Sequence, residues 1–232
     1  MSREKHWQAL RVLGIPELGC AAILGNAEAE SNCETNRVQG DFELSRAWSR
    51  AYTSMVDAGE ISRDDFIFRG PGGGGYGWMQ WTLQSRKAGY YDHAKKLGVS
   101  IGSQEAAISW FWHEVNQPEY KKVLDAILTG SNLREISDVF LTVFERPADM
   151  SESVRIARAR MAQEILQEYG GKDPQPEPEP DPQPAAKADP VVRMLQACMA
   201  QDGYWPEDRI DGVKSPEFRD KIREYAADVA AC

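Results

Sequence analysis

Two glutamates in the segment Gly25-Asn-Ala-Glu-Ala-Glu-Ser-Asn32 have the chemistry of an acid catalyst. The small apolar residues 18–24 before them predict a buried helix whose end opens toward a cleft. A carboxyl group beside such an apolar wall keeps its proton, because desolvation penalises the charged form, and it suits general acid catalysis. Glu28 and Glu30 are about 200° apart around a helix, so at most one faces a given cleft, and spacing does not choose between them. The alternative is two solvated glutamates on an exposed turn.

A second candidate is the aromatic segment Gly75-Tyr-Gly-Trp-Met-Gln-Trp-Thr82, which follows a run of glycines. Sugars present flat C–H faces that aromatic rings cover and hydroxyl groups that amides bind. The glycines allow the backbone to approach a ligand closely. This composition favours saccharide binding, and the alternative is an aromatic hinge packed into the core.

A third candidate is Glu145, in the sequence Phe144-Glu-Arg-Pro147 at the end of an amphipathic helix expected over 132–145. Its carboxyl group either faces the cleft or holds Arg146 or another arginine in a structural ion pair. The sequence leaves both interpretations open.

Metal and cofactor sites are not expected. The three histidines stand alone, no His-Glu-x-x-His is present, and the four cysteines (Cys20, Cys33, Cys198 and Cys232) are far apart. Zinc sites require closely spaced ligands that this pattern lacks. We expect free thiols, with a Cys198–Cys232 bridge as the alternative.

The elements that must position these residues are mostly helical. Apolar residues recur at intervals of three and four through residues 44–56 and 133–144, which is the period of a helix. Further helices are expected over 4–13, 17–30, 80–96, 103–117, 119–129 and 151–168. Only Phe66-Ile-Phe-Arg69 looks strand-like, and with the following glycines it predicts a short hairpin or extended loop.

Proline marks a domain boundary. Seven of the thirteen prolines lie between Pro174 and Pro190, in an acidic segment without any large apolar residue. Such a segment cannot join a core and favours an extended spacer. We therefore expect a catalytic domain over 1–169, a linker over 170–189 and a small module of short helices over 190–232.

The amino-acid composition limits the kinds of partner that the protein is expected to bind. The 232 residues include 36 acidic and 27 basic side chains, a net charge of −9, which argues against nucleic acid as the main partner. No apolar run is long enough to span a membrane, and no secretory signal is visible at the N-terminus. We expect a monomer that does not bind membranes.

The motifs and their order along the chain resemble those of the phage tail lysozyme family, which belongs to the wider lysozyme and lytic-transglycosylase superfamily. The resemblance covers residues 5–168. The matching residues are Ala21-Ala-Ile-Leu-Gly-Asn-Ala-Glu-Ala-Glu-Ser31, Tyr52-Thr53, Val56-Asp-x-Gly59, Phe66, Gly75–Thr82, Ser85-Arg86, Trp112-His-Glu-Val-Asn116 and Phe144–Pro147. The resemblance implies an all-α, lysozyme-like catalytic domain.

The resemblance also selects site residues. The glutamate of a Glu-Ser pair that ends a buried helix is the catalytic acid of the superfamily, and this position is Glu30. The substrate contacts that we expect are Tyr76, Gln80, Trp81, Trp78, Ser31 and Glu145. An inverting mechanism needs a second carboxylate about 6.5–9.5 Å away. The candidates are Asp41, Glu43, Asp57 and Glu145.

The implied protein is a bacteriophage or prophage endolysin that hydrolyses the β-1,4 bond between N-acetylmuramic acid and N-acetylglucosamine in peptidoglycan. It would stay in the host cytoplasm until a holin releases it to the cell wall. The alternatives are a lytic transglycosylase, which forms 1,6-anhydro products, a non-catalytic wall-binding or tail protein, and an enzyme that cleaves peptide or amide bonds.

The C-terminal module is similar to three-helix peptidoglycan-binding modules. The matching pieces are Val192-x-x-Leu-Gln196, Asp202-Gly-Tyr204 and Ile210-Asp-Gly212, whereas the closing segment 215–225 departs from the usual pattern. The expected ligand is the cell wall.

Overall fold

The computed structural model describes residues 3–42, 45–68, 74–171, 195–196, 198–200 and 221–222. These residues are mostly helical and include no β-strand, so the all-α prediction is confirmed. In place of a hairpin, two isolated antiparallel bridges join Tyr76 to Val38 and to Trp81. They hold the aromatic segment as a compact loop.

The helices begin and end close to the expected positions. They are α1 (Arg3–Val12), α2 (Glu17–Ser31), α3 (Ala47–Ala58), α4 (Arg63–Phe68), α5 (Gln84–Leu97), α6 (Gln104–Val115), the 3₁₀ helix η2 (Pro118–Tyr120), α7 (Lys121–Thr129), α8 (Leu133–Val139), the π-helix η3 (Phe140–Glu145) and α9 (Glu152–Tyr169). The helix expected over 132–145 changes to π geometry in its second half, just before Glu145.

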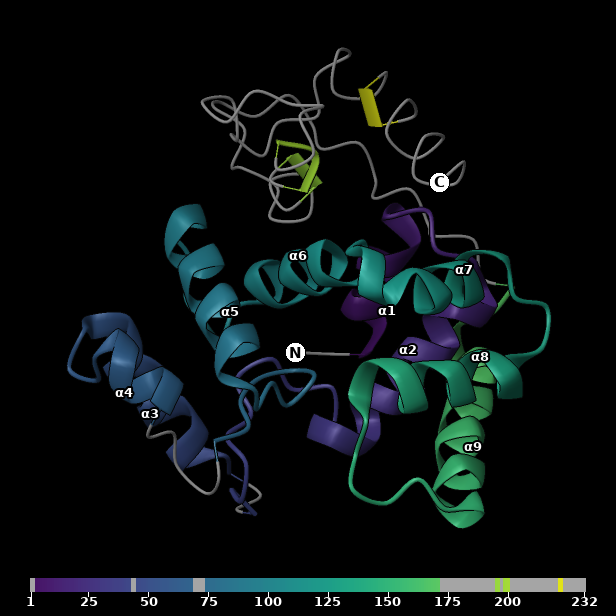
Figure 1. Ribbon diagram of the computed structural model, residues 1–232, viewed down its shortest axis with the longest axis horizontal. Helices are drawn as coiled ribbons and strands as arrows, with labels where there is room; N and C mark the ends of the chain where they lie inside the picture. The colour runs from purple at the N-terminus through teal and green to yellow at the C-terminus, as the bar shows by residue number, and fades with distance from the viewer. Residues whose placement is uncertain are drawn as a thin grey trace, which may run out of the picture.

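The helices form two groups (Figure 1). One contains α3, α4 and α5, the other contains α1, α2, α7, α8 and α9, and α6 runs between them. Helix α2 lies at the centre of the larger group and packs mainly against α9, with further contacts to α8, α1 and α7. Every residue from Gly19 to Ala27 is buried, which confirms the predicted buried helix before the glutamates.

The close packing of α2 on α9 depends on Gly25. A Cβ atom at this position would lie 2.6 Å from the backbone nitrogen of Ala162. Glycine therefore allows the two helices to approach until their backbones almost touch. This approach also determines how near the end of α2 comes to the side chains of α9.

The strand predicted at Phe66-Ile-Phe-Arg69 is wrong where the structure describes it, because Phe66–Phe68 complete helix α4. Ser62 begins this helix, since its Oγ accepts from the backbone nitrogen of Asp65 at 3.1 Å and donates to the Asp65 carboxylate at 2.7 Å. The bond from the Asp65 backbone nitrogen to Ser62 Oγ satisfies a donor of the first helical turn and favours a helix. Phe66 and Ile67 are buried while Phe68 is 60 % exposed.

The expected boundary near residue 170 lies where α9 ends. The linker beyond Gly171, most of the C-terminal module, Glu43 and Cys232 lie outside the described residues, so the domain division and the Cys198–Cys232 bridge stay predictions. None of the described helices has both the length and the apolar character needed to cross a membrane.

Candidate active site

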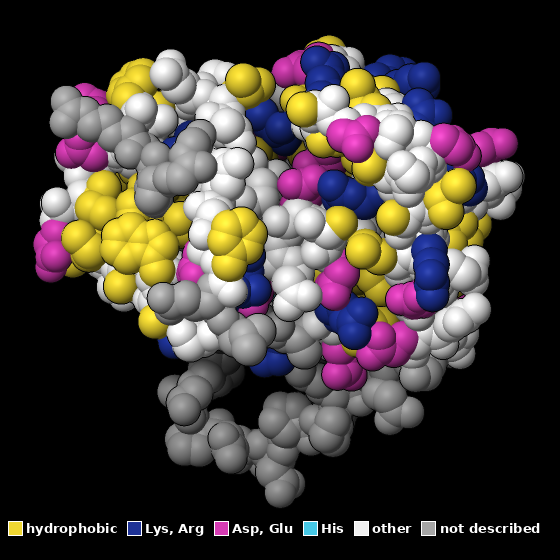
Figure 2. Space-filling model, turned by 90° about the horizontal axis from the view of Figure 1, so that it is seen from below, with side chains coloured by type: hydrophobic (Ala, Val, Ile, Leu, Met, Phe, Trp, Pro, Cys, Tyr) yellow, Lys and Arg dark blue, Asp and Glu magenta, His cyan; other side chains and the backbone are white. Residues whose placement is uncertain are grey.

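A cleft of about 880 Å³ contains three of the predicted site residues, Glu30, Gln80 and Glu145. Its walls come from the end of α2, the loops around residues 37–42 and 79–83, and the segment that follows η3. The residues lining it are Ala29, Glu30, Arg37, Gln39, Gly40, Phe42, Met79, Gln80, Thr82, Leu83, Arg86, Tyr120, Phe144, Glu145, Arg146, Pro147 and Ala148. On the face shown in Figure 2, acidic and basic side chains lie side by side among hydrophobic ones.

The structure chooses between the two glutamates of α2. Glu30 lines the cleft, and its side chain is 20 % exposed. Glu28 does not line the cleft and lies 4.0 Å from Arg3 in an ion pair. Asn32 ends the helix in the left-handed conformation, with φ of 57°, and turns the chain away after the Glu-Ser pair. Residues other than glycine rarely adopt this left-handed conformation, because it costs free energy. Where they do, the position is often part of a functional site.

Arg158 of α9 is the direct partner of Glu30. Its Nη2 donates to Glu30 Oε1 at 2.5 Å, and its Nη1 donates to the carbonyl oxygen of Asn26 at 2.6 Å. Both Arg158 and Asn26 are buried. These two hydrogen bonds fix the position of the Glu30 carboxyl group at the cleft.

Glu145 is the second carboxyl group of the cleft. It ends η3, and Arg146 follows it in the left-handed conformation, with φ of 52°. Its Oε1 is buried and has no hydrogen-bond partner among the described residues. Burial, together with the negative charge of Glu30, raises the pKa of Glu145 to about 8, although Arg86 and Arg158 act in the opposite direction. Glu145 is thus a candidate proton carrier at neutral pH.

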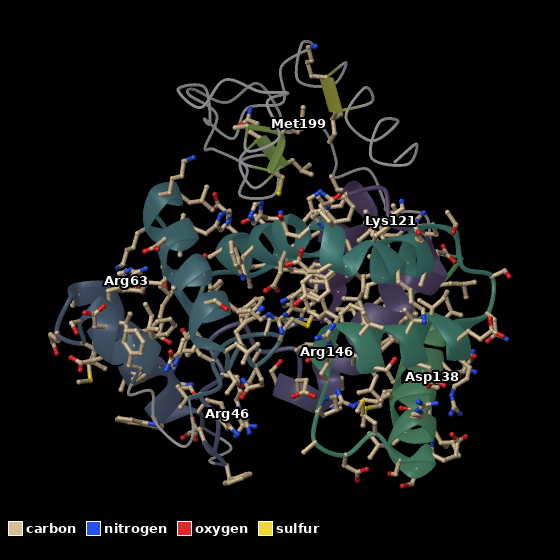
Figure 3. The ribbon with its side chains drawn as sticks, viewed as in Figure 1. Arg46, Arg63, Lys121, Asp138, Arg146 and Met199 are labelled. Carbon is tan, nitrogen blue, oxygen red and sulfur yellow. The ribbon has the colours of Figure 1, made fainter. Side chains whose placement is uncertain are left out.

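The suggested ion pair of Glu145 with Arg146 does not form. The Nε of Arg146 donates instead to the carbonyl oxygen of Val143 at 2.7 Å. Figure 3 shows Arg146 at the end of η3, while Arg46 lies with the other group of helices, near the start of α3. The cleft-facing interpretation of Glu145 fits its position in the cleft wall.

The other candidates for a second carboxylate have structural partners. Asp41 is buried and accepts from the backbone nitrogen and the hydroxyl of Ser49, at 3.0 and 2.5 Å. Asp57 accepts from Ser100 Oγ at 2.5 Å and from the backbone nitrogen of Ile101 at 3.0 Å. Neither Asp41 nor Asp57 lines the cleft. Of the described candidates, only Glu145 does.

Gln80 has a constrained position at the cleft wall. Its backbone φ is 46°, and its Nε2 donates to the carbonyl oxygens of Arg37 and Gly77, at 3.1 and 2.9 Å. These two bonds orient the side-chain amide relative to the cleft. The structure therefore brings Gln80 together with Glu30 and Glu145, as the motif order led us to expect.

The aromatic residues predicted to contact substrate lie behind the cleft. Tyr76, Trp78 and Trp81 are buried, and so is Ser31. Tyr76 shares a hydrogen bond of 2.6 Å with Thr53, and Ser31 donates to the carbonyl oxygen of Trp78 at 2.7 Å. This matches the alternative of an aromatic hinge packed into the core. A direct contact of these four residues with substrate stays a prediction, and their burial favours a supporting role.

A buried ion pair connects two of the motifs. Glu114 accepts from Arg86 Nε and Nη2 at 2.5 and 2.7 Å, and from Trp81 Nε1 at 2.9 Å. The Arg86 guanidinium also lies over the Phe144 ring, 4.6 Å from its centroid. These contacts hold the aromatic segment beside the residue that precedes Glu145. Glu114 and Arg86 both occur in the matching motifs, but their role was not predicted.

Arg158 was missed altogether. It lies 128 residues from Glu30 in the sequence, in a helix that carries several arginines, so no local pattern distinguishes it. Within the described part of the chain, no group of histidine, cysteine and acidic side chains could hold a metal ion. The buried Cys20 and Cys33 are free thiols, as expected, and burial raises the pKa of both.

A helical fold with two carboxyl groups at one cleft has the functional groups of an acid–base hydrolase. The chain belongs to the phage tail lysozyme family, whose model matches residues 2–169. No curated protein and no solved structure matches it. Membership of this family identifies the protein as a lysozyme-type cell-wall hydrolase with peptidoglycan as its substrate.

Proposed function

We propose that the protein is an endolysin that hydrolyses the β-1,4 bond between N-acetylmuramic acid and N-acetylglucosamine. The main support is that Glu30 and Glu145 line the same cleft in unlike surroundings. Glu30 is paired with Arg158, whereas Glu145 has a buried oxygen without a hydrogen-bond partner in the described structure. Two carboxyl groups in unlike surroundings at one cleft, one to donate a proton and one to activate water, are what glycoside hydrolysis requires.

The reaction would proceed by acid–base catalysis. A protonated carboxyl group donates its proton to the glycosidic oxygen while the transition state develops oxocarbenium character, and water then attacks. The second carboxylate activates this water. Glu30 is the residue that the family resemblance selects, and its role as the acid stays a prediction. Gln80 would bind sugar hydroxyl groups through the amide that its two backbone contacts orient.

The second carboxyl group favours hydrolysis over the transglycosylase reaction. In a lytic transglycosylase the muramoyl 6-hydroxyl attacks internally, so no base is needed to activate water. Mass spectrometry of digested peptidoglycan separates the two reactions, because hydrolysis gives reducing ends and the transglycosylase gives 1,6-anhydro ends. We expect reducing ends.

The matched variants Glu30→Gln and Glu28→Gln test the proposal. We expect Glu30→Gln to lower the release of soluble fragments from purified peptidoglycan by about 100-fold or more, the usual effect of losing a catalytic carboxyl group. Its circular dichroism spectrum and its binding to intact walls should be unchanged. Glu28→Gln, outside the cleft, should retain nearly full activity. Normal turnover in Glu30→Gln would remove Glu30 from the mechanism.

The remaining parts of the proposal concern the whole chain. The protein would act as a monomer, remain in the host cytoplasm until a holin releases it, and bind the wall through residues 190–232. Tethering the catalytic domain through a proline-rich spacer would raise its effective concentration at the glycan. Intact walls should therefore retain the full-length Glu30→Gln protein without being degraded.

A further inference from the structure

Gln39 is a cleft residue to which the proposed function gives no role. It lines the cleft and is exposed, and both its backbone and its side chain bind Gly75. The backbone nitrogen of Gln39 donates to the carbonyl oxygen of Gly75 at 2.9 Å, and Gln39 Oε1 accepts from the backbone nitrogen of Gly75 at 2.9 Å. Because the side-chain oxygen is turned toward Gly75, the amide nitrogen Nε2 is the free end. None of the described residues accepts a hydrogen bond from it.

Gln80 offers the other end of its amide. Its Nε2 donates to the carbonyl oxygens of Arg37 and Gly77, which uses both hydrogens of the amide nitrogen. Its Oε1 accepts no hydrogen bond from any residue that the structure describes, and the side chain lines the cleft. The cleft wall therefore carries one free amide donor, on Gln39, and one free amide acceptor, on Gln80.

Gly75 is the common neighbour of the two amides. A Cβ atom added to Gly75 would lie 2.8 Å from Gln39 Oε1 and 3.1 Å from Gln80 Oε1, so the missing side chain leaves room for both. Phe42 and Leu83, which are 87 % and 65 % exposed, line the same cleft, each three residues after one of the glutamines. The two loops thus supply a donor, an acceptor and exposed apolar surface.

We infer that Gln39 is a specificity-determining residue that, together with Gln80, binds the 2-acetamido group of an N-acetylated sugar. The inference rests on the proposed function, because it names the chemical group by which the cleft recognises the glycan. The acetamido carbonyl oxygen accepts from Gln39 Nε2, the acetamido N–H donates to Gln80 Oε1, and the methyl group contacts Phe42 or Leu83. Gln80 then binds the amide of the sugar rather than a hydroxyl group.

An acetamido group suits this pair better than a hydroxyl group does. An amide has one N–H donor and one carbonyl acceptor in fixed directions, whereas a hydroxyl group rotates to serve either partner and requires no fixed pair. Because backbone contacts already hold both glutamine amides, little side-chain freedom is lost when the sugar binds. A site of this kind discriminates against a sugar that leaves its polar groups unpaired.

Binding of two neutral β-1,4-linked tetrasaccharides tests the inference. The probes are the tetramer of N-acetylglucosamine and cellotetraose, in which a hydroxyl group replaces each acetamido group. The full-length Glu30→Gln protein is the background, since slow turnover keeps the probes intact, and isothermal titration calorimetry measures Kd. We expect the N-acetylated tetramer to bind about 10-fold or more tightly than cellotetraose. Equal affinities would overturn the inference.

Gln39→Glu is the decisive variant, because it nearly preserves the shape of the side chain. The new carboxylate still accepts from the Gly75 backbone nitrogen, but its free end no longer donates to the acetamido carbonyl. We expect the N-acetylated tetramer to bind about 10-fold or more weakly and cellotetraose to change little, since sugar hydroxyl groups donate to a carboxylate. Gln84→Glu is the matched control, because it adds the same charge at an exposed position outside the cleft.

Gln39→Ala separates the lost donor from the added charge. It removes the amide without introducing a carboxylate, and it should also reduce the preference for the N-acetylated tetramer. An unchanged preference in either Gln39 variant would refute the role of Gln39, and so would equal weakening of both tetramers. If Gln39→Glu does not fold, as judged by circular dichroism, Gln39→Ala decides.

Activity gives a separate result. In the chain with Glu30 intact, Gln39→Glu should raise KM for peptidoglycan and change kcat less, as expected for a binding contact, and a loss confined to kcat would contradict the role of Gln39. If the wild-type chain releases no glycan fragments, the proposed function fails, while the preference between the tetramers still decides the inference. If fragments are released and the preference does not depend on Gln39, only the inference fails.

Discussion

Ser31 Oγ donates a hydrogen bond of 2.7 Å to the carbonyl oxygen of Trp78, 47 residues further along the chain. Ser31 directly follows Glu30, and Trp78 lies two residues before Gln80. The bond therefore joins the two segments that supply an acid and an amide to the cleft. Because Ser31 is buried, we interpret the Glu-Ser pair as one cleft residue followed by one structural residue.

Ser31→Ala should reduce stability. The substitution leaves the buried carbonyl oxygen of Trp78 without its hydroxyl donor. An unsatisfied buried polar group costs about 1–3 kcal/mol of stability. Urea unfolding followed by circular dichroism measures the change. Thr82→Ala is the control, since Thr82 is exposed and its hydroxyl donates, within the described part of the chain, to the nearby carbonyl oxygen of Gln80 alone. Equal stability of Ser31→Ala and wild type would show that the contact is unimportant.

Gly25→Ala should also be destabilising, although alanine is a better helix former than glycine. The added methyl group would meet backbone and side-chain atoms of Ala162 at 2.6 to 2.8 Å. Overpacking of this kind costs about 1–3 kcal/mol. Displacement of α2 from α9 would also disturb the Glu30–Arg158 contact, so we expect lower activity as well.

A double-mutant cycle with Ala162→Gly identifies the cause. The double variant should lose somewhat less free energy of unfolding than the two single variants together, because glycine at 162 removes the Cβ that the new methyl group would meet at 2.8 Å, while the backbone atoms stay in place. Strictly additive effects would assign the cost of Gly25→Ala to the backbone of residue 162 and not to its side chain.

Glu114→Gln should be the most destabilising of these changes. It removes the charge that pairs with the partly buried Arg86 and alters the acceptor of Trp81 Nε1. Removing one partner of a buried ion pair costs about 3–5 kcal/mol. In thermal unfolding, the melting temperature should fall substantially for Glu114→Gln and hardly at all for Glu119→Gln, since Glu119 is an exposed glutamate five residues away. Similar melting temperatures for the two variants would contradict the role given to this pair.

Glu145 should make the protein less stable as the pH rises. Its pKa is raised in the folded state from 4.5 to about 8, so the folded state binds a proton that the unfolded state has lost. This contribution to stability is complete below pH 4.5 and disappears as the pH rises through about 8. Melting temperatures between pH 5 and 9 should fall for wild type and less steeply for Glu145→Gln. Parallel curves would argue against a proton on Glu145.

His93 should make the protein less stable as the pH falls into the acid range. Burial lowers the pKa of His93 from 6.5 to about 3, with smaller contributions from His113 and Lys96. The folded state therefore keeps His93 neutral, and stability is lost as the pH falls from 6.5 toward 3. His93→Gln should flatten this acid limb and leave the alkaline limb unchanged, whereas Glu145→Gln should do the reverse. A variant that changes both limbs equally would point to a general loss of packing.

The helices and their approximate bounds follow from local sequence. Apolar spacing at three and four residues depends only on neighbours within two turns, and it predicted the amphipathic helix before Glu145. The run of small apolar residues 18–24 predicted the buried helix before Glu30. The order of the motifs was enough to predict the family. The six residues of α4 were too few for their period to show, and the hydrogen bonds between Ser62 and Asp65 stabilise the start of this helix.

The properties of the site depend on residues that are distant in the chain. Glu30 was distinguished from Glu28 by family resemblance alone, and the fold then placed Glu30 in the cleft beside Arg158 of α9. The burial of Tyr76 and of the Glu145 oxygen was likewise not visible in composition or spacing. The charge and accessibility of a side chain are determined by everything packed around it, and only the tertiary structure brings those groups together.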